Sequence, residues 1–135
     1  MAPKVPVQGM ELFLSQVHTI GVVDDDEDVR DSIVAVFRSE GIGVYAFSSA
    51  ESLLASPLID TLECLVTDLH MPGIDGFGLR RELMDQGKHL PVVMMTAFAT
   101  PEARDMADSL GIAQFLEKPA DPDELLKVVR SLIAN

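Results

Sequence analysis

The sequence predicts one α/β domain in which helices cover both faces of a doubly wound, parallel β-sheet. Three observations favour this fold class. Five short apolar segments alternate along the chain with five segments of helical periodicity. Three of the apolar segments are nearly continuous hydrophobic runs, which is typical of strands buried on both faces. A length of 135 residues and an apolar content of 47% suffice for one such domain and its core.

The first 18 residues do not follow this pattern and are expected to form an N-terminal leader ahead of a domain over residues 19–135. Pro3, Pro6 and Gly9 are typical of a flexible segment. Met10–Val17 places apolar residues at helical spacing, which predicts either a short additional helix or an ordered arm.

The first half of the domain is expected to contain three strands and two helices. The strands are predicted at Ile20–Val23, Ile42–Phe47 and Cys64–Thr67. Between the first two, apolar residues recur at positions i, i+4, i+7 and i+8, which predicts a helix that ends at Gly41, with Asp26 as its N-cap. Ser48 and Glu51 form a capping-box pattern, so we expect the second helix to begin after Ser48.

The second half is expected to add two strands and three helices. The strands are predicted at Val92–Met95 and Gln114–Leu116. A helix over Gly76–Gln86 is expected to bury Leu79, Leu83 and Met84. A helix over Pro101–Leu110 is expected to bury Ala103, Met106, Ala107 and Leu110. The last helix has the clearest start, because Asp121 is a good N-cap and Pro122 suits the first helical position.

The charge of the chain excludes several classes of function. Ten Lys and Arg residues against 22 Asp and Glu residues give a net charge of −12. Such a surface repels phosphate groups, so we expect neither direct binding of nucleic acid nor attachment to an anionic membrane. The chain has no long apolar run, no signal-peptide pattern and a single cysteine, Cys64, so a cytoplasmic protein without a disulfide is the simplest expectation.

Polar residues that can carry chemistry follow four of the five predicted strands. Asp24 and Asp25 follow the first strand, Asp68 the third, Thr96 the fourth and Lys118 the fifth. Parallel strands end at one edge of a sheet, so we expect these side chains to gather there. Clustered carboxylates without His or Cys favour Mg²⁺. A carboxylate beside that metal can attack phosphorus, while an ammonium and a hydroxyl take the charge of the phosphoryl oxygens.

With these residues in place, the sequence resembles the receiver domains of two-component response regulators, the CheY-like family. The resemblance extends over residues 19–135 and rests on four ordered motifs, VVDDDEDVR, LVTDLHMPGIDGFGL, VVMMTAFA and FLEKP. It implies a flavodoxin-like sheet with strand order 2-1-3-4-5 and five flanking helices. It also implies a signalling switch that accepts a phosphoryl group on Asp68 from a histidine kinase or a His phosphotransfer protein.

The resemblance further implies how the metal is held. Asp24 and Asp25 match the acidic pair of the family. Mg²⁺ is then expected to be ligated by Asp25, Asp68 and the backbone carbonyl of His70, with Asp24 acting mainly through water.

The same resemblance implies how the switch operates. Thr96 is the switch hydroxyl, Phe115 the aromatic switch residue and Lys118 the phosphate-binding lysine, and the Lys118–Pro119 bond is expected to be cis. Phosphorylation is then expected to change the face made by the fourth helix, the fifth strand and the fifth helix, for partner binding or for a homodimer.

Two further residues are expected to modulate dephosphorylation. His70 and Phe98 lie two positions beyond Asp68 and Thr96, beside the path of an attacking water. The Phe98 ring can exclude that water, whereas the His70 imidazole can position it. We expect exclusion to dominate and the aspartyl phosphate to be long-lived.

Alternatives to this function stay open at this point. A Mg²⁺-dependent phosphohydrolase of the haloacid dehalogenase type also uses an aspartate nucleophile, but it needs a second Asp where this chain has His70. The domain could also be a binding module that is never phosphorylated, or a receiver cut from a larger helix-turn-helix transcription regulator. His18, His70 and His89 show no zinc-binding spacing, and Cys64 is expected to be an inert core thiol.

Overall fold

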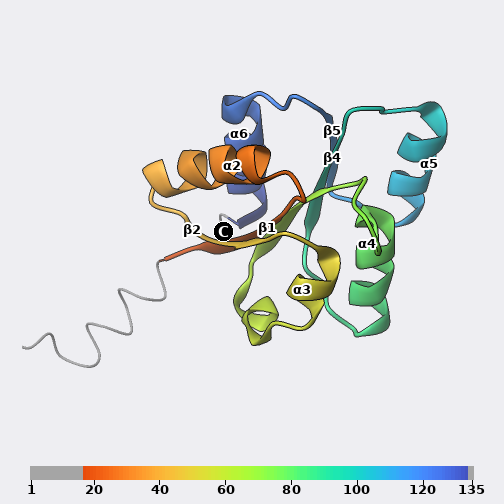
Figure 1. Ribbon diagram of the computed structural model, residues 1–135, viewed down its shortest axis with the longest axis horizontal. Helices are drawn as coiled ribbons and strands as arrows, with labels where there is room; N and C mark the ends of the chain where they lie inside the picture. The colour runs from red at the N-terminus through yellow and green to blue at the C-terminus, as the bar shows by residue number, and fades with distance from the viewer. Residues whose placement is uncertain (1–16, 134–135) are drawn as a thin grey trace, which may run out of the picture.

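Five parallel strands form the centre of the computed structural model, which describes residues 17–133 (Figure 1). They are β1 (Thr19–Val23), β2 (Gly43–Phe47), β3 (Cys64–Asp68), β4 (Val92–Thr96) and β5 (Gln114–Glu117). The order across the sheet is β2-β1-β3-β4-β5, as the resemblance implied. The helix or arm expected at Met10–Val17 lies outside the described residues, apart from Val17 itself.

Helices cover both faces of this sheet, as predicted (Figure 1). They are α2 (Glu27–Ser39), α3 (Ala50–Leu54), α4 (Gly76–Asp85), α5 (Pro101–Ser109) and α6 (Pro122–Ile133). One core cluster lies between the sheet and α2 and α6, and the other lies beneath α3, α4 and α5. Each strand contributes to both clusters by alternation, so that Val66 packs on one side and Leu65 on the other. None of the described helices is long and apolar enough to cross a membrane.

The helix starts follow local side-chain chemistry, with one correction. Asp26 caps α2, because its carboxylate accepts hydrogen bonds from the amides of Asp28 and Val29 at 2.9 and 3.2 Å. Pro122 is the first residue of α6, as expected. The start expected at Ser48 is wrong by one residue. Ser49 is the N-cap of α3, and its hydroxyl accepts from the Ser52 amide at 3.1 Å.

The shift of this cap changes the role of Glu51. Its carboxylate accepts a hydrogen bond from the Ile74 amide at 3.4 Å, across to the loop that follows β3. A Cβ at Gly73 would come within 2.2 Å of a Glu51 oxygen, and Gly73 also has a φ of +77°. A glycine is therefore required where α3 meets this loop.

Two methionines expected in the core lie at the surface. Met84 is 48% exposed and Met106 is 38% exposed, whereas Leu79 and Leu83 are fully buried as predicted. In α5 only Ala107 is buried. For Met106 the physical reason is position, because α5 lies at the β5 side of the sheet and has less sheet surface to cover than a central helix, whereas Met84 belongs to α4, whose buried face is made by Leu79 and Leu83.

A short 3-10 helix, η1 (Pro57–Thr61), was not predicted. The Ser56 hydroxyl accepts from the Leu58 amide at 3.2 Å, and Pro57 occupies the first position. The Ser–Pro pair is the signal that could have revealed this element. The element leads the chain back under the sheet to the start of β3.

Candidate functional site

Three carboxylates gather at the carboxyl edge of the sheet. Asp24 and Asp25 follow β1, and Asp68 is the last residue of the neighbouring strand β3. One oxygen of each carboxylate lies within 4.8 Å of the others. Asp24 is fully buried and Asp68 is 6% exposed, whereas Asp25 is open to solvent. The expectation that strand ends would bring these residues together is confirmed for this cluster.

Lys118 joins two of these carboxylates. Its Nζ lies 3.0 Å from Oδ2 of Asp24 and 3.3 Å from Oδ2 of Asp68. The backbone places it there, because the Lys118 amide donates to the Thr96 carbonyl at 2.7 Å, beyond the paired ends of β4 and β5. The Lys118–Pro119 bond is cis, as the resemblance implied.

Thr96 is the last residue of β4 and is fully buried. Its hydroxyl oxygen accepts a hydrogen bond from the Phe98 amide at 3.1 Å, so it holds the start of the loop that leads to α5. The hydroxyl proton is not used by this contact. The Thr96 hydroxyl is therefore free to donate this proton to an incoming oxygen.

The charges of the cluster do not balance. The cluster holds three carboxylates, the Lys118 ammonium contacts only those of Asp24 and Asp68, and Asp68 lies at the end of a buried strand. Burial raises the pKa of Asp68; the nearby Lys118 charge opposes this effect and the Asp24 charge adds to it. The pKa of Lys118 is also raised: burial lowers it, but the hydrogen bond and charge of Asp24, with Asp68, outweigh that effect. The site therefore favours an additional cation.

The donor set fits a hard divalent ion. All of its ligand atoms are carboxylate oxygens. Two of the side chains are buried and one is exposed to solvent, so a bound Mg²⁺ could keep some of its water ligands. The His70 amide points towards Oδ1 of Asp68 at 3.4 Å, and the His70 side chain is exposed. His18 lies elsewhere, with its Nδ1 2.6 Å from the Glu63 carboxylate.

The two aromatic residues expected near the switch differ in their surroundings. Phe115 is half-buried against the core cluster beneath α3, α4 and α5, and the Arg104 guanidinium of α5 lies 5.7 Å from the centre of its ring. Phe98 is 72% exposed.

Cys64 is buried, and burial raises the pKa of its thiol to about 12, which confirms it as an unreactive core residue.

The sequence reasoning missed Arg30. This side chain comes from the first turn of α2, and its Nη1 donates to the carbonyl of Asp24 at 2.7 Å. It lies in the same VVDDDEDVR segment that drew attention to the aspartates. Its position six residues after Asp24 was the available signal. Arg30 is the fourth residue of the helix that Asp26 caps, and this position faces back towards the end of β1.

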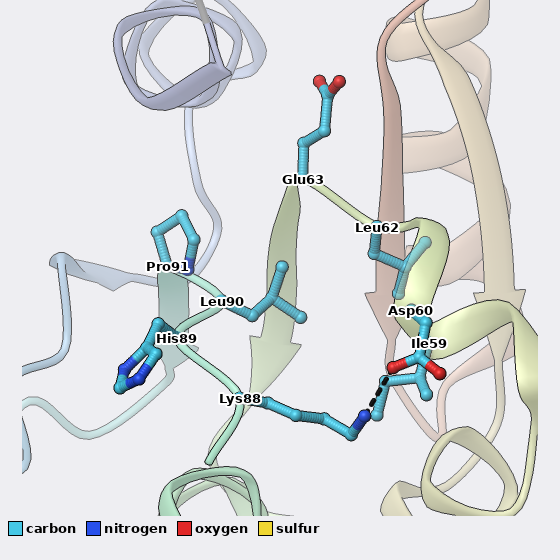
Figure 2. Close-up of a pocket in the computed structure, with 8 residues that line it drawn as sticks. All are labelled: Ile59, Asp60, Leu62, Glu63, Lys88, His89, Leu90 and Pro91. Carbon is cyan, nitrogen blue, oxygen red and sulfur yellow. Dashed lines mark hydrogen bonds and ion pairs between the residues drawn. The ribbon is translucent and has the colours of Figure 1, made fainter.

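The amino edge of the sheet holds a separate hollow of about 280 Å³ (Figure 2). It lies before β3 and β4, where Lys88 forms an ion pair with Asp60. Figure 2 shows Glu63 and His89 directed away from that pair, so these polar groups do not converge. A larger groove of about 530 Å³ adjoins the carboxyl edge between α2 and the segment from Lys118 to Pro122. The converging charges thus lie at the carboxyl edge.

Five parallel strands in this order, with the acidic cluster, the lysine and the buried hydroxyl at the carboxyl edge, define a domain with the CheY-like fold. The family model of the response regulator receiver domain matches residues 20–130, and the chain belongs to this family of two-component proteins. The exact division into a leader over residues 1–18 and a domain over 19–135 stays a prediction.

Individual relatives agree with this family. The chain is 38% identical over 116 residues to the transcriptional regulatory protein FixJ of Azorhizobium caulinodans, covering 86% of this chain and 55% of that protein. It is 35% identical to nodulation protein W of Bradyrhizobium diazoefficiens, covering 90% of this chain and 54% of that protein. The chain therefore spans about half the length of these curated relatives.

Solved structures give the same result. The crystal structure of FixJ-N has a TM-score of 0.76 at 31% identity and covers 85% of this chain and 92% of that one. A Francisella response regulator receiver domain has a TM-score of 0.78 at 28% identity and covers 86% of this chain and 96% of that one.

Proposed function

We propose that this chain is a phosphorylation-activated switch in which Asp68 accepts a phosphoryl group from a histidine kinase or a His phosphotransfer protein. The observation that carries the proposal is the position of the Asp68 carboxylate, 3.3 Å from the Lys118 ammonium and within 4.8 Å of the Asp24 and Asp25 oxygens. The haloacid dehalogenase alternative gains no support, because His70 occupies the place of its second aspartate.

The chemistry needs no general base, because a carboxylate nucleophile has no proton to lose. An oxygen of Asp68 forms the new bond to phosphorus, and the bond from phosphorus to the donor imidazole nitrogen breaks. The electron pair of that bond stays on the imidazole nitrogen. Lys118 offsets the charge of the transferred group, and the Thr96 hydroxyl donates to one of its oxygens.

Mg²⁺ is the cofactor that this site fits. We expect Asp25, Asp68 and the backbone carbonyl of His70 to bind it directly, and Asp24 to act mainly through water. Bound there, the ion would supply positive charge that relieves the repulsion among the carboxylates and orients the donor phosphoryl group. Asp24 is suited to the indirect role, because its two side-chain oxygens already accept from Lys118 and from the Asp26 amide.

The switch is expected to act on the face made by α5, β5 and α6, which are the fourth helix, fifth strand and fifth helix of the earlier prediction. When Thr96 moves towards a phosphoryl oxygen, its bond to the Phe98 amide is disturbed, and the loop into α5 moves with it. Phe115 then rotates inward and leaves Arg104. The changed face binds a partner or a second copy of the chain.

The wider context is also a proposal. The part of this chain that matches covers only about half of each relative named above, and one of them is a transcriptional regulatory protein. We infer that the domain serves a cytoplasmic regulator, with any DNA contact made outside this acidic chain.

The test is phosphorylation by a small donor. Acetyl phosphate with Mg²⁺ should add one acid-stable, base-labile phosphoryl group to the wild type and none to Asp68→Asn, as read by intact-protein mass spectrometry. Asp85→Asn is the matched control, since this exposed carboxylate lies at the end of α4 and should leave labelling unchanged. Full labelling of Asp68→Asn would disprove the assignment of the acceptor.

A further inference from the structure

Arg30 connects α2 to the acidic edge of the sheet. Its Nη1 donates to the main-chain carbonyl of Asp24 at 2.7 Å, in a half-buried position. The guanidinium thus meets the backbone of an aspartate, while Lys118 meets its carboxylate. A bond to the backbone fixes geometry, whereas a bond to the carboxylate mainly offsets charge.

Asp24 is held at four separate points. Its amide donates to the Phe47 carbonyl at 3.1 Å, and its carbonyl accepts from Arg30. Its two side-chain oxygens accept from the Asp26 amide at 2.9 Å and from Lys118 at 3.0 Å. Three of these partners belong to the strand end, the turn or the site itself, and only Arg30 reaches in from a helical side chain.

The Asp24 carbonyl belongs to the peptide plane that connects Asp24 with Asp25. Because that plane is rigid, a fixed carbonyl also fixes the direction in which the chain enters Asp25. Asp25 is the exposed member of the acidic cluster, so its direction depends on the backbone more than on packing. Holding the carbonyl therefore aims the Asp25 carboxylate at the cluster.

We propose that Arg30 is a positioning residue that aims Asp25 at the metal by clamping the Asp24 carbonyl. This inference rests on the proposed function, since it assumes that the cluster binds Mg²⁺. It assigns Arg30 a role through the backbone rather than through contact with the metal or the phosphoryl group.

The direction in which Mg²⁺ affinity changes when Arg30 is removed distinguishes a positioning role from a purely electrostatic one. A guanidinium bound to the Asp24 carbonyl repels a cation that enters the acidic cluster, so its removal should strengthen Mg²⁺ binding if charge is all that matters. If Arg30 positions Asp25, its removal should weaken Mg²⁺ binding instead, by about the tenfold typical of groups that orient metal ligands.

The experiment is a Mg²⁺ titration of the full chain, with the thermal midpoint as the readout. We expect Arg30→Met to raise the apparent Mg²⁺ dissociation constant about tenfold. Its phosphorylation rate by acetyl phosphate should recover to nearly that of the wild type at saturating Mg²⁺, because Asp68, Thr96 and Lys118 are intact. Arg38→Met is the matched control, since Arg38 lies on the same helix and donates to the Val44 carbonyl at 3.3 Å.

Binding by Arg30→Met that is equal to or tighter than that of the wild type would overturn the proposal. If Arg30→Met does not fold, Arg30→Lys against Arg38→Lys decides, and equal Mg²⁺ affinities in that pair would overturn it as well. A wild type that binds no Mg²⁺ at millimolar concentration would contradict the proposed function itself, and the role of Arg30 with it.

Discussion

Helices α5 and α6 both flank the edge strand β5, yet they are attached to the molecule very differently. Helix α6 buries four apolar side chains, Leu125, Leu126, Val129 and Ile133. Helix α5 buries only Ala107. Since a fully buried aliphatic side chain contributes about 1.5–3 kcal/mol, most of the packing energy of the two helices beside β5 belongs to α6.

The difference shows where the fold can move at low cost. Apart from Ala107, α5 is held by the partly buried Ala103, by the Arg104 guanidinium over the Phe115 ring, and by the Arg80 guanidinium, which donates to the Leu110 carbonyl at 2.9 Å. Segments with few buried contacts open and shift most easily. The chain that leads from the buried Thr96 therefore enters the least firmly packed helix beside the site.

The comparison predicts the largest contrast in stability. Leu125→Ala in α6 should lower the free energy of unfolding by about 2–5 kcal/mol, because it leaves a cavity in the core. Met106→Ala in α5 should change it by less than about 0.5 kcal/mol, since this side chain lies at the surface. Urea denaturation measures both, and equal losses would show that α5 is packed as firmly as α6.

A second test follows the two helices through activation. Beryllofluoride with Mg²⁺, a mimic of the phosphoryl group, should change amide exchange over residues 96–117 by about tenfold, which corresponds to about 1.4 kcal/mol. Residues 125–133 should change far less. Identical exchange over residues 96–117 in both states would refute a switch on this face.

The acidic edge offers a third test, because burying the charged Asp68 carboxylate costs free energy, whereas burying the apolar side chains of α6 stabilises the fold. The pKa of Asp68 is raised above its usual value of 3.8, so the folded chain binds this proton more tightly than the unfolded chain does. This tighter proton binding contributes fully to the free energy of unfolding below about pH 4, and the contribution is lost as the pH rises through the raised pKa of Asp68.

Asp68→Asn removes that loss. Without metal, the variant should be more stable than the wild type at pH 7.5, and its advantage should shrink towards pH 4. Urea midpoints at the two pH values measure the difference. A variant that is less stable at pH 7.5 would mean that the Lys118 contact outweighs the cost of burying the charge.

The smallest expected effect concerns the life of the phosphorylated state. Phe98→Asn should speed the loss of the phosphoryl group about fivefold, equivalent to about 1 kcal/mol in the barrier, because the ring no longer excludes water. Phe98→Leu is the control and should decay at the wild-type rate. Decay after removal of the donor is the measurement. Slower decay in Phe98→Asn would overturn this argument, and a large slowing in His70→Ala would show that His70 directs the water.

The features that sequence predicted well are those set by local rules or by topology. Asp26 caps α2 because its own carboxylate reaches the next turn, and Asp24 meets Asp68 because parallel strands end at one edge. The burial of Met84 and Met106 could not be judged from spacing alone, because helical periodicity identifies a face without saying how much sheet lies beneath it. Arg30 was missed because its target is a backbone carbonyl, so only its spacing from Asp24, and not the type of its partner residue, could have indicated the contact.

The ion pair between Lys118 and Asp24 joins residues that are 94 positions apart in the chain. A nascent or truncated chain that ends before β5 would carry the three aspartates but lack the lysine that neutralises part of their charge. Because such distant contacts form late when folding is limited by chain topology, the site is completed only when the last strand is in place. An incomplete chain would therefore lack the complete form of the proposed phosphoacceptor site, and phosphorylation by a small donor would report that the chain has folded through β5.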